Sequence, residues 1–344
     1  MAEGPDIFQP RERFRGYTVE RLLGKGGLGA VYLVRHDVLD TLFALKVLYP
    51  HTAEANSEYV KRFHREARLA TRIRHPGLVA VHDCGFDEGR GLHWLVMDYV
   101  AGGDLRTALA LAGRFEPARA TAVVRQLASA LAAAQRFKVV HRDIKPENVM
   151  VQPDGAVKLV DLGIAKADNL GESLKTMSRS ILGTPVYISP EQSLSAADVD
   201  LRADVYSLGI VYFEMVAGRT PYPGLAPIDM LVRLLSEEPT PPVRSVEPSV
   251  PAAVAELIDA MCSKDRSARP GDYGELLSRL DALGYGRPEP AAEAEYAEEP
   301  AAEGSMADIL KALDLGAAGP AEDVRRRSGV FAGLRRLFGA GRRA

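Results

Sequence analysis

Residues 141–148 read His141-Arg142-Asp143-Ile144-Lys145-Pro146-Glu147-Asn148. This stretch places an acid, a base and a carboxamide close together, after a long helical pattern and before a short strand. A carboxylate, an ammonium and an amide at this spacing suit one task, in which the carboxylate accepts a hydroxyl proton beside a metal and a transferring phosphoryl group. If this interpretation holds, the rest of the chain must supply groups that bind phosphates and a metal.

The overall composition is that of an ordinary soluble globular protein. Of the 344 residues, 47% are hydrophobic and 26% are charged, and the formal net charge is -3. This length predicts a large buried core, in about two to three domains or in one large bilobal domain. The slightly negative charge argues against a nucleic-acid partner, which usually requires a basic surplus.

Cysteine usage and hydropathy predict a location inside the cell. Cys84 and Cys262 lie far apart and outside any metal-binding spacing, which favours two reduced thiols. Residues 1–14 lack the apolar core of a signal peptide, and no stretch approaches the roughly 20 apolar residues of a membrane span. We therefore expect a cytoplasmic protein.

A glycine-rich loop interrupts two strand-like segments near the N-terminus. Tyr17 to Leu23 is rich in β-forming residues, and Ala30 to Arg35 resumes the pattern. The loop between them reads Gly24-Lys25-Gly26-Gly27-Leu28-Gly29. This order predicts a β-hairpin whose glycine amides could approach a phosphate, because glycine has no Cβ atom. Taken alone, the loop fits a plain tight turn at least as well.

A lysine stands inside the next strand-like segment. Thr41 to Leu48 is an apolar run that carries Lys46. Ser57 to Ile73 follows with helical periodicity, and Glu66 lies beside its apolar face. A carboxylate there could hold the Lys46 ammonium toward phosphates. The alternative is that Lys46 simply faces outward.

The remaining pattern predicts a small sheet followed by a larger helical region. Leu78 to Phe86 and His93 to Val100 complete an antiparallel sheet of five strands with one helix, and Gly102-Gly103 marks its end. Beyond this boundary, helices are expected at 105–111, 117–137, 203–216, 228–235, 252–261 and 273–283, and short strands at 149–151 and 156–160.

An acid follows the second short strand directly. In Asp161-Leu162-Gly163, the carboxylate stands at a strand end, where it could hold a metal. Residues 167–181 then carry several hydroxyl side chains without any periodicity, and this predicts a long exposed loop.

Taken in order, these motifs resemble those of the eukaryotic-like serine/threonine protein kinases of bacteria. The similarity runs from about Tyr17 to Leu283 and depends on the ordered set rather than on any one member. In chain order, the matching parts are the glycine loop, Ala44-Leu45-Lys46, Glu66, residues 141–148, Asp161-Leu162-Gly163, Gly183-Thr184-Pro185, Ser189-Pro190-Glu191, Asp204 and Arg269. The resemblance implies a bilobal α+β fold, with an N-lobe at 17–101 and a C-lobe at 102–283.

The resemblance also implies catalytic roles. Asp143 would accept the proton of the substrate hydroxyl, and Lys145 would offset charge on the moving phosphoryl group. Asn148 and Asp161 would hold Mg2+. Lys46, fixed by Glu66, would grip the α- and β-phosphates of ATP. Thr184 belongs to the same catalytic set and, together with Lys145, resembles the serine/threonine branch of the family.

The nucleotide site implied by the resemblance spans both lobes. The amides of the glycine loop would cover the phosphates, and the backbone of the segment between the lobes would bind adenine. The implied residues are Leu23, Gly24, Lys25, Gly26, Gly27, Leu28, Gly29, Val31, Ala44 and Met150 around the nucleotide, Asp98 and Val100 for backbone hydrogen bonds, and Asp104 for the ribose.

Regulation by the loop is implied as well. Arg142 and Lys166 would receive a phosphate carried by Thr176 or Ser178 after autophosphorylation. The alternative is that a loop rich in serine and threonine is merely soluble. Leu162, Ser189 and Leu28 depart from the usual family residues, but none of these changes removes a charged catalytic group.

Flanking segments complete the expected domain organisation. Residues 1–16 form an N-terminal arm, and residues 284–304 form an acidic, disordered linker. The tail, 305–344, contains a short amphipathic helix and a basic amphipathic segment, which would dock on a partner or on the kinase, bind an anionic membrane surface, or have no specific role.

Three function classes remain open from the sequence. The first is an active kinase that uses ATP and Mg2+ on protein substrates, with a homodimer as an open question. The second is a pseudokinase scaffold, but such scaffolds tend to lose part of the charged set that is intact here. The third is a small-molecule phosphotransferase, which would be expected to lack Ser189-Pro190-Glu191 and the framework that runs from Asp204 to Arg269.

Overall fold

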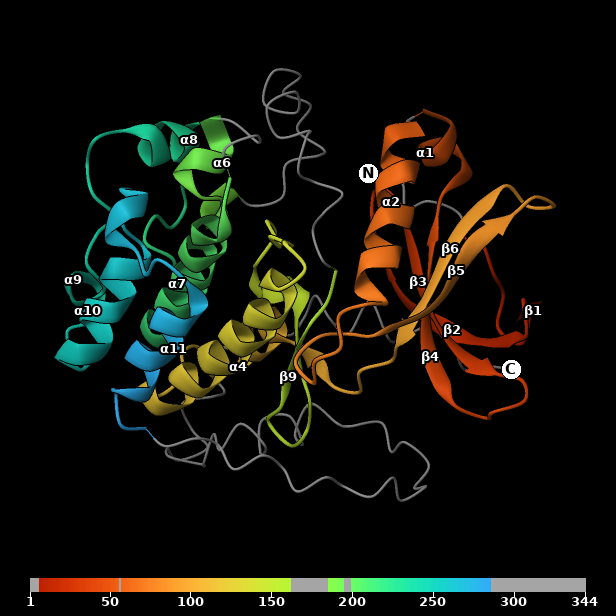
Figure 1. The fold of residues 1–344 in the computed structure, drawn as a ribbon, viewed down its shortest axis with the longest axis horizontal. Helices are drawn as coiled ribbons and strands as arrows, with labels where there is room; N and C mark the ends of the chain where they lie inside the picture. The colour runs from red at the N-terminus through yellow and green to blue at the C-terminus, as the bar shows by residue number, and fades with distance from the viewer. Residues whose placement is uncertain (1–5, 56, 162–184, 195–198, 286–344) are drawn as a thin grey trace, which may run out of the picture.

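The computed structural model describes residues 6–55, 57–161, 185–194 and 199–285, which fold into two lobes (Figure 1). The N-terminal lobe is built on a six-stranded antiparallel sheet with strand order β1-β2-β3-β4-β6-β5. Its strands are β1 (Arg13–Phe14), β2 (Tyr17–Lys25), β3 (Gly29–His36), β4 (Leu42–Leu48), β5 (Val81–Asp87) and β6 (Leu92–Asp98). The bilobal α+β fold predicted from the sequence is therefore confirmed.

Two details of the N-terminal lobe differ from the prediction of five strands and one helix. β1 adds an edge strand, because Phe14 packs into an aromatic cluster against Phe8 and Trp94, with ring centroids 4.8 and 5.9 Å away. A short helix α1 (Pro50–Ala55) precedes α2 (Ser57–Ala70). Both extra elements are too short to produce a recognisable period in the sequence.

Helix α2 lies across one face of this sheet (Figure 1). Its apolar side, with Phe63 and Ala67, packs against Leu48 of β4 and Leu95 of β6. The spacing of four residues between Phe63 and Ala67 puts both on one face of the helix. Glu66, next to this face, is thereby carried to the inner side of the lobe.

A glycine marks the passage into the C-terminal lobe. Gly102 has a φ of +125°, which side-chain-bearing residues rarely adopt, and a Cβ atom there would lie 2.1 Å from the Val151 carbonyl oxygen. This close approach lets β7 (Gly103–Asp104) pair with β8 (Val149–Val151), which in turn pairs with β9 (Val157–Leu159). The small sheet positions the loop that ends at Asn148.

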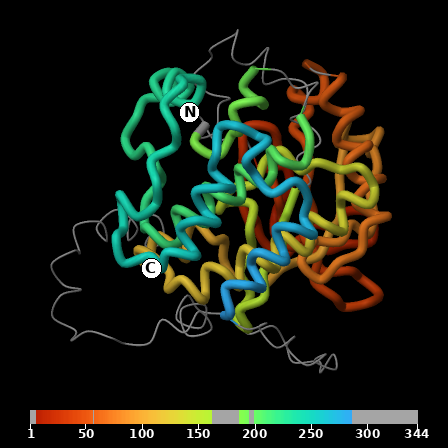
Figure 2. Tube along the Cα trace, turned by 60° about the vertical axis from the view of Figure 1, so that its left-hand side comes forward, coloured from red at the N-terminus to blue at the C-terminus, as the bar shows by residue number. Residues whose placement is uncertain are grey.

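The C-terminal lobe is mainly helical. Its longer helices surround α7, in which every residue from Ala203 to Val216 is buried. Helix α11 packs along α4, as both views show (Figures 1 and 2). The elements are α3 (Leu105–Ala112), α4 (Pro117–Gln135), η1 (Pro146–Asn148), η3 (Pro185–Tyr187), α6 (Pro190–Leu194), α7 (Leu201–Ala217), α8 (Pro227–Leu235), α9 (Val243–Val246), α10 (Ala252–Met261), η4 (Arg266–Ala268) and α11 (Tyr273–Asp281).

The segment between α2 and β5 connects the lobes a second time. Leu78 forms a parallel bridge with Leu159 of β9, and the backbone amide of Leu159 donates to the Gly77 carbonyl at 2.9 Å. Residues of the N-terminal lobe are thus hydrogen-bonded to the strand that leads to Asp161. Within the described ranges, no helix is long and apolar enough to cross a membrane.

Candidate active site

The backbone at the start of the stretch 141–148 is hydrogen-bonded to a buried carboxylate of α7. Asp204 accepts hydrogen bonds from the backbone amides of His141 and Arg142, both at 2.7 Å, and from the Tyr273 hydroxyl at 3.2 Å. Arg142 has a φ of +65°, a sparsely populated conformation for a residue with a side chain. A buried acceptor on two consecutive amides stabilises this bend, which directs the next residue, Asp143, to the surface of the site.

His141 has a structural role. It is buried, and its Nδ1 accepts a hydrogen bond from the Asp143 amide at 3.3 Å. Burial lowers the pKa of His141, which favours the neutral imidazole. His141 therefore packs within the site rather than acting as a base.

Asp143 is the centre of a small polar cluster. One of its carboxylate oxygens, Oδ2, lies 3.2 Å from Lys145 Nζ and accepts a hydrogen bond from Asn148 Nδ2 at 2.8 Å. The same Asn148 amide also donates to the Asp143 carbonyl at 2.8 Å. The acid, the base and the carboxamide predicted from the sequence therefore meet in space, and each restricts the rotamers of the others.

Lys46 on β4 reaches across to the end of β9. Its Nζ lies 2.6 Å from Oδ1 of Asp161, and the two side chains are 25% and 39% exposed. Burial acts to lower the pKa of Lys46, but the charges of Asp161 and Glu66 outweigh it and raise the pKa, so that Lys46 remains an ammonium.

Lys46 has a carboxylate partner besides the predicted Glu66. The sequence suggested that Glu66 fixes this lysine, and the charge of Glu66 does act on Lys46, but Asp161 adds a direct ion pair. Two carboxylates therefore lie near one ammonium. The carboxylate at the end of β9 makes the direct hydrogen bond here.

Asp161 and Asn148 are suitable ligands for a divalent cation. Both present oxygen donors, the type that Mg2+ prefers. The Val160 amide donates to the Asn148 carbonyl at 2.9 Å, which fixes the backbone next to Asp161 against that of Asn148. Asn148 Nδ2 is directed to Asp143, so its amide oxygen remains as the ligand atom.

These two residues would need further ligands. Among the described residues, no group of three or more His, Cys, Asp or Glu side chains could hold a metal ion. Mg2+ commonly binds to one or two protein ligands and completes its coordination with substrate phosphates and water. The residues therefore fit a cation that arrives together with a phosphorylated ligand.

The glycine loop forms the expected hairpin between β2 and β3. Its closing bond runs from the Gly26 amide to the Gly29 carbonyl at 2.9 Å. A Cβ atom on Gly29 would lie 2.0 Å from the Val47 carbonyl oxygen, so this glycine is required for packing on β4. Lys25 forms a 2.9 Å ion pair with Asp6. Gly24, Gly26, Gly27 and Leu28 remain exposed at the bend.

The residues implied for the nucleotide come from both lobes. Ala44 is buried in β4, Val31 and Met150 are partly buried in β3 and β8, and Leu23 is 36% exposed in β2. Val100 is buried between the lobes. Two further implied residues, Asp98 and Asp104, have structural partners of their own. Asp104 caps α3 by accepting from the Thr107 amide at 2.6 Å.

Four of the predicted catalytic and regulatory residues belong to the part of the chain that is not described. Lys166, Thr176, Ser178 and Thr184 lie outside the described residues. Arg142 is described, and its guanidinium has no hydrogen-bond or ion-pair partner in the part of the chain that the structure describes.

Sequence reasoning missed the arginine that holds the far end of the stretch 141–148. Arg106 of α3 pairs with Glu147 at 2.9 Å and with Glu214 of α7 at 2.6 Å, and it also contacts the Tyr187 hydroxyl. Tyr187 in turn donates to Glu214 at 2.5 Å. Burial acts against the charge of Arg106, but its bond to Glu214 and the neighbouring charges raise its pKa. The only available signal was an arginine directly after a helix start.

A second missed group is the Asp98 side chain, which joins the lobes. It accepts from His82 Nε2 at 2.7 Å, from the Ala80 amide at 3.2 Å and from Lys158 Nζ of β9 at 3.0 Å. Burial acts to raise the pKa of Asp98, but the three hydrogen bonds outweigh this effect. The pKa is therefore lowered, and the carboxylate stays charged. The resemblance implies a role only for the backbone of this residue.

Comparison with known proteins agrees with this geometry. The model of the protein kinase domain matches residues 17–279. The chain is 36% identical over 249 residues to serine/threonine-protein kinase PrkC of Bacillus subtilis, which covers 72% of this chain and 37% of that protein. It is 34% identical over 277 residues to serine/threonine-protein kinase PknA of Mycobacterium tuberculosis, with 80% and 62% covered.

Solved structures of a protein kinase domain have the same fold. The kinase domain of Mycobacterium tuberculosis PknI superposes with a TM-score of 0.63 at 30% identity, over 80% of this chain and 99% of that one. Since the family model covers most of the chain and the fold, motifs and site geometry agree with it, the chain belongs to the protein kinase domain family.

Proposed function

We propose that this chain transfers the γ-phosphate of ATP to serine and threonine hydroxyls of proteins. The chain spans 37%, 50% and 62% of the length of three curated relatives, all named as serine/threonine-protein kinases. The observation that carries the proposal is the Asp143 carboxylate, held between Lys145 Nζ and Asn148 Nδ2. A carboxylate in this setting can accept a hydroxyl proton while a cation beside it offsets phosphoryl charge.

The chemistry places different demands on each residue. Asp143 orients the substrate hydroxyl and takes its proton, and Lys145, whose Nζ lies 3.2 Å from that carboxylate, stabilises the anionic transition state. Lys46 would bind the phosphates of ATP, with Glu66 as the second carboxylate near its ammonium. Asp161 and Asn148 would hold Mg2+, which would supply positive charge next to the phosphates.

The nucleotide site is proposed between the two lobes, next to these groups. The amides of Gly24, Gly26, Gly27 and Gly29 cover the phosphates. The further proposed contacts are Leu23, Lys25, Leu28, Val31, Ala44, Asp98, Val100, Asp104 and Met150. Thr184 remains part of the proposed catalytic set.

Phosphorylation of a generic basic protein with labelled ATP tests the proposal. Asp143→Asn should lower the rate by about 10²–10⁴-fold, because an amide accepts no proton. Asp154→Asn is the matched control, since Asp154 is exposed in the β8–β9 turn and asparagine keeps the bond to the Ala156 amide. Phosphoamino-acid analysis should yield phosphoserine and phosphothreonine.

Equal labelling by Asp143→Asn and the parent would contradict the assigned role. Nucleotide binding without turnover by the parent would instead favour the scaffold interpretation. A label on small metabolites but not on protein would favour the small-molecule phosphotransferase.

We also propose activation by autophosphorylation at Thr176 or Ser178. Arg142 supports this idea, because its guanidinium stands beside the site with no partner among the described residues and could bind a phosphate together with Lys166. Mass spectrometry after incubation with Mg-ATP tests the proposal, and Arg142→Gln should reduce the benefit of phosphorylation. An active preparation with both residues unmodified would refute it.

The remaining proposals concern partners and location. We infer a cytoplasmic kinase that acts on protein substrates and whose residues 305–344 bind a partner or an anionic membrane surface. Sedimentation of the full chain with anionic and neutral vesicles at low salt distinguishes these two. Failure to bind anionic vesicles would exclude the membrane.

A further inference from the structure

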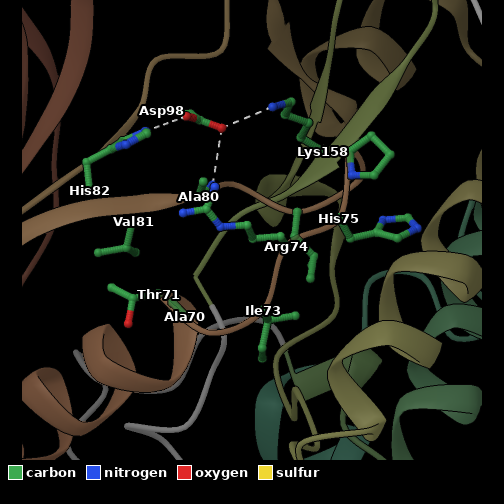
Figure 3. A pocket seen from close by; sticks show the side chains of 12 residues that line it. Ala70, Thr71, Ile73, Arg74, His75, Ala80, Val81, His82, Asp98 and Lys158 are labelled. Carbon is green, nitrogen blue, oxygen red and sulfur yellow. Dashed lines mark hydrogen bonds and ion pairs between the residues drawn. The ribbon is translucent and has the colours of Figure 1, made fainter.

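A cavity of about 390 Å³ lies behind the segment that joins the lobes, away from Asp143 and the glycine loop. It is bounded by the end of α2, the loop that leads to β5, and β9 (Figure 3). Its size is within the range of small-molecule sites, roughly 300–1,000 Å³. None of the residues proposed above for phosphate transfer lines it, apart from the side chain of Asp98.

One wall of the cavity carries positive charge. The Asp98 carboxylate at this wall already accepts three hydrogen bonds, from His82, Lys158 and the Ala80 amide. Lys158 has three donor hydrogens and uses one of them for Asp98, so donors remain for a ligand. Figure 3 shows Lys158 and His82 on opposite sides of Asp98.

Arg74 adds a second cation to the lining. Its side chain lines the cavity and extends toward Ala80, beneath Asp98 (Figure 3). Among the described residues, it has no hydrogen-bond or ion-pair partner. Arg74 and Lys158 together exceed the single negative charge of Asp98, so the cavity favours an anion.

The opposite wall is apolar. Ile73 and Leu78 form its buried base, and Pro76 and Val81 are the more accessible apolar residues of the lining. An inorganic anion would leave Pro76 and Val81 in contact with water, whereas a ligand with an apolar body would cover them. Burial of apolar surface contributes about 25 cal/mol per Å².

We propose that this cavity binds an organic anion, in which a phosphate or carboxylate group contacts Arg74 and Lys158 and an apolar body rests on Pro76 and Val81. The ligand would lie against the Asp98 bridge between the lobes. This site is separate from the proposed phosphate transfer and does not depend on it.

Phenyl phosphate and phenylacetate are suitable probes, since they combine a ring with each anionic group. Binding to the full chain is followed by amide chemical shifts, in the presence of a saturating Mg-ATP analogue that occupies the nucleotide site. We expect shifts at Ile73 and Ala80. Comparison of the two probes identifies which anionic group is preferred.

Arg74→Gln should weaken binding by roughly tenfold or more, because a hydrogen bond to a charged group is lost. Arg72→Gln is the matched control, since Arg72 is exposed two residues earlier and does not line the cavity. Benzyl alcohol, which is uncharged, should bind more weakly than either anion.

Three results would overturn the proposal. They are the absence of shifts at Ile73 and Ala80 with both probes, equal affinity of Arg74→Gln and Arg72→Gln, and binding of inorganic phosphate as tight as that of phenyl phosphate. The last result would mean that the apolar wall takes no part.

Discussion

Replacement of Arg269 by leucine should destabilise the C-terminal lobe strongly. Its side chain is fully buried and pairs with Glu191 at 2.6 and 3.0 Å through two nitrogens. It also donates to the carbonyls of Ser263 at 2.7 Å, Arg202 at 2.8 Å and Lys264 at 3.3 Å. A leucine fills part of this volume but donates to none of these acceptors.

The magnitude follows from the groups that are left behind. Removal of one partner of a buried ion pair costs about 3–5 kcal/mol, and each buried carbonyl that loses its donor adds up to about 1 kcal/mol. With some access of water to the carbonyls, the total is about 5 kcal/mol. Since about 1 kcal/mol shifts the melting temperature of a large domain by 2–4 °C, we expect Tm to fall by about 10–20 °C.

Thermal unfolding followed by circular dichroism measures this effect. Arg279→Leu is the matched control, because its pair with Glu275 spans 3.6 Å with both side chains well exposed, and such pairs contribute little. Adding Glu191→Gln to the Arg269→Leu variant should recover part of the loss, because it removes the unpaired carboxylate. The reasoning is refuted if Arg269→Leu shifts Tm no more than Arg279→Leu does.

Three further variants test separate parts of the structure. Lys46→Met should lower the phosphorylation rate by about 10²–10³-fold while the far-UV spectrum stays unchanged, since a preorganised cation is lost from the phosphate site. His64 and His93 share a 2.9 Å hydrogen bond, and burial lowers the pKa of both side chains. The two neutral rings therefore contribute fully to stability above the unfolded pKa of about 6.5, and this contribution is lost as the pH falls below that value. His64→Gln should therefore reduce the drop in urea midpoint between pH 7 and pH 5, and an unchanged drop would contradict this assignment. Gly29→Ala should destabilise the protein by about 1–3 kcal/mol because its Cβ would overlap a carbonyl of β4, whereas Gly27→Ala, which meets nothing within 4 Å, should leave the melting temperature nearly unchanged.

Elements with a clear local signal could be predicted from the sequence. The helix at 252–261 appears at the predicted positions, and the strand at 149–151 does as well. Both have a local pattern of apolar residues and clear end signals, proline before the helix and a turn after the strand. The two-residue strand β1 was missed because its existence depends on the aromatic packing of Phe14 rather than on any period.

The charged partners within the site were harder to predict. The sequence indicated Glu66 as the carboxylate beside Lys46, whereas Asp161, which forms the direct ion pair, lies 115 residues away along the chain. No local rule decides between two such partners, because the choice depends on how closely β4 approaches the end of β9. The same limit applies to Arg106, whose partner Glu214 is 108 residues distant.

Helix α7 explains why the stretch 141–148 is so well held. Asp204 near its start binds the backbone of His141 and Arg142, and Glu214 near its end reaches Glu147 through Arg106. A rise of 1.5 Å per residue separates these two carboxylates by about 15 Å, so the helix supports both ends of the stretch. Buried charges are costly unless they are paired, and here each is paired with the stretch or with its bridging arginine. The cost of burying them is thus offset by bonds that fix Asp143 before any substrate binds, which is the preorganisation that phosphoryl transfer requires.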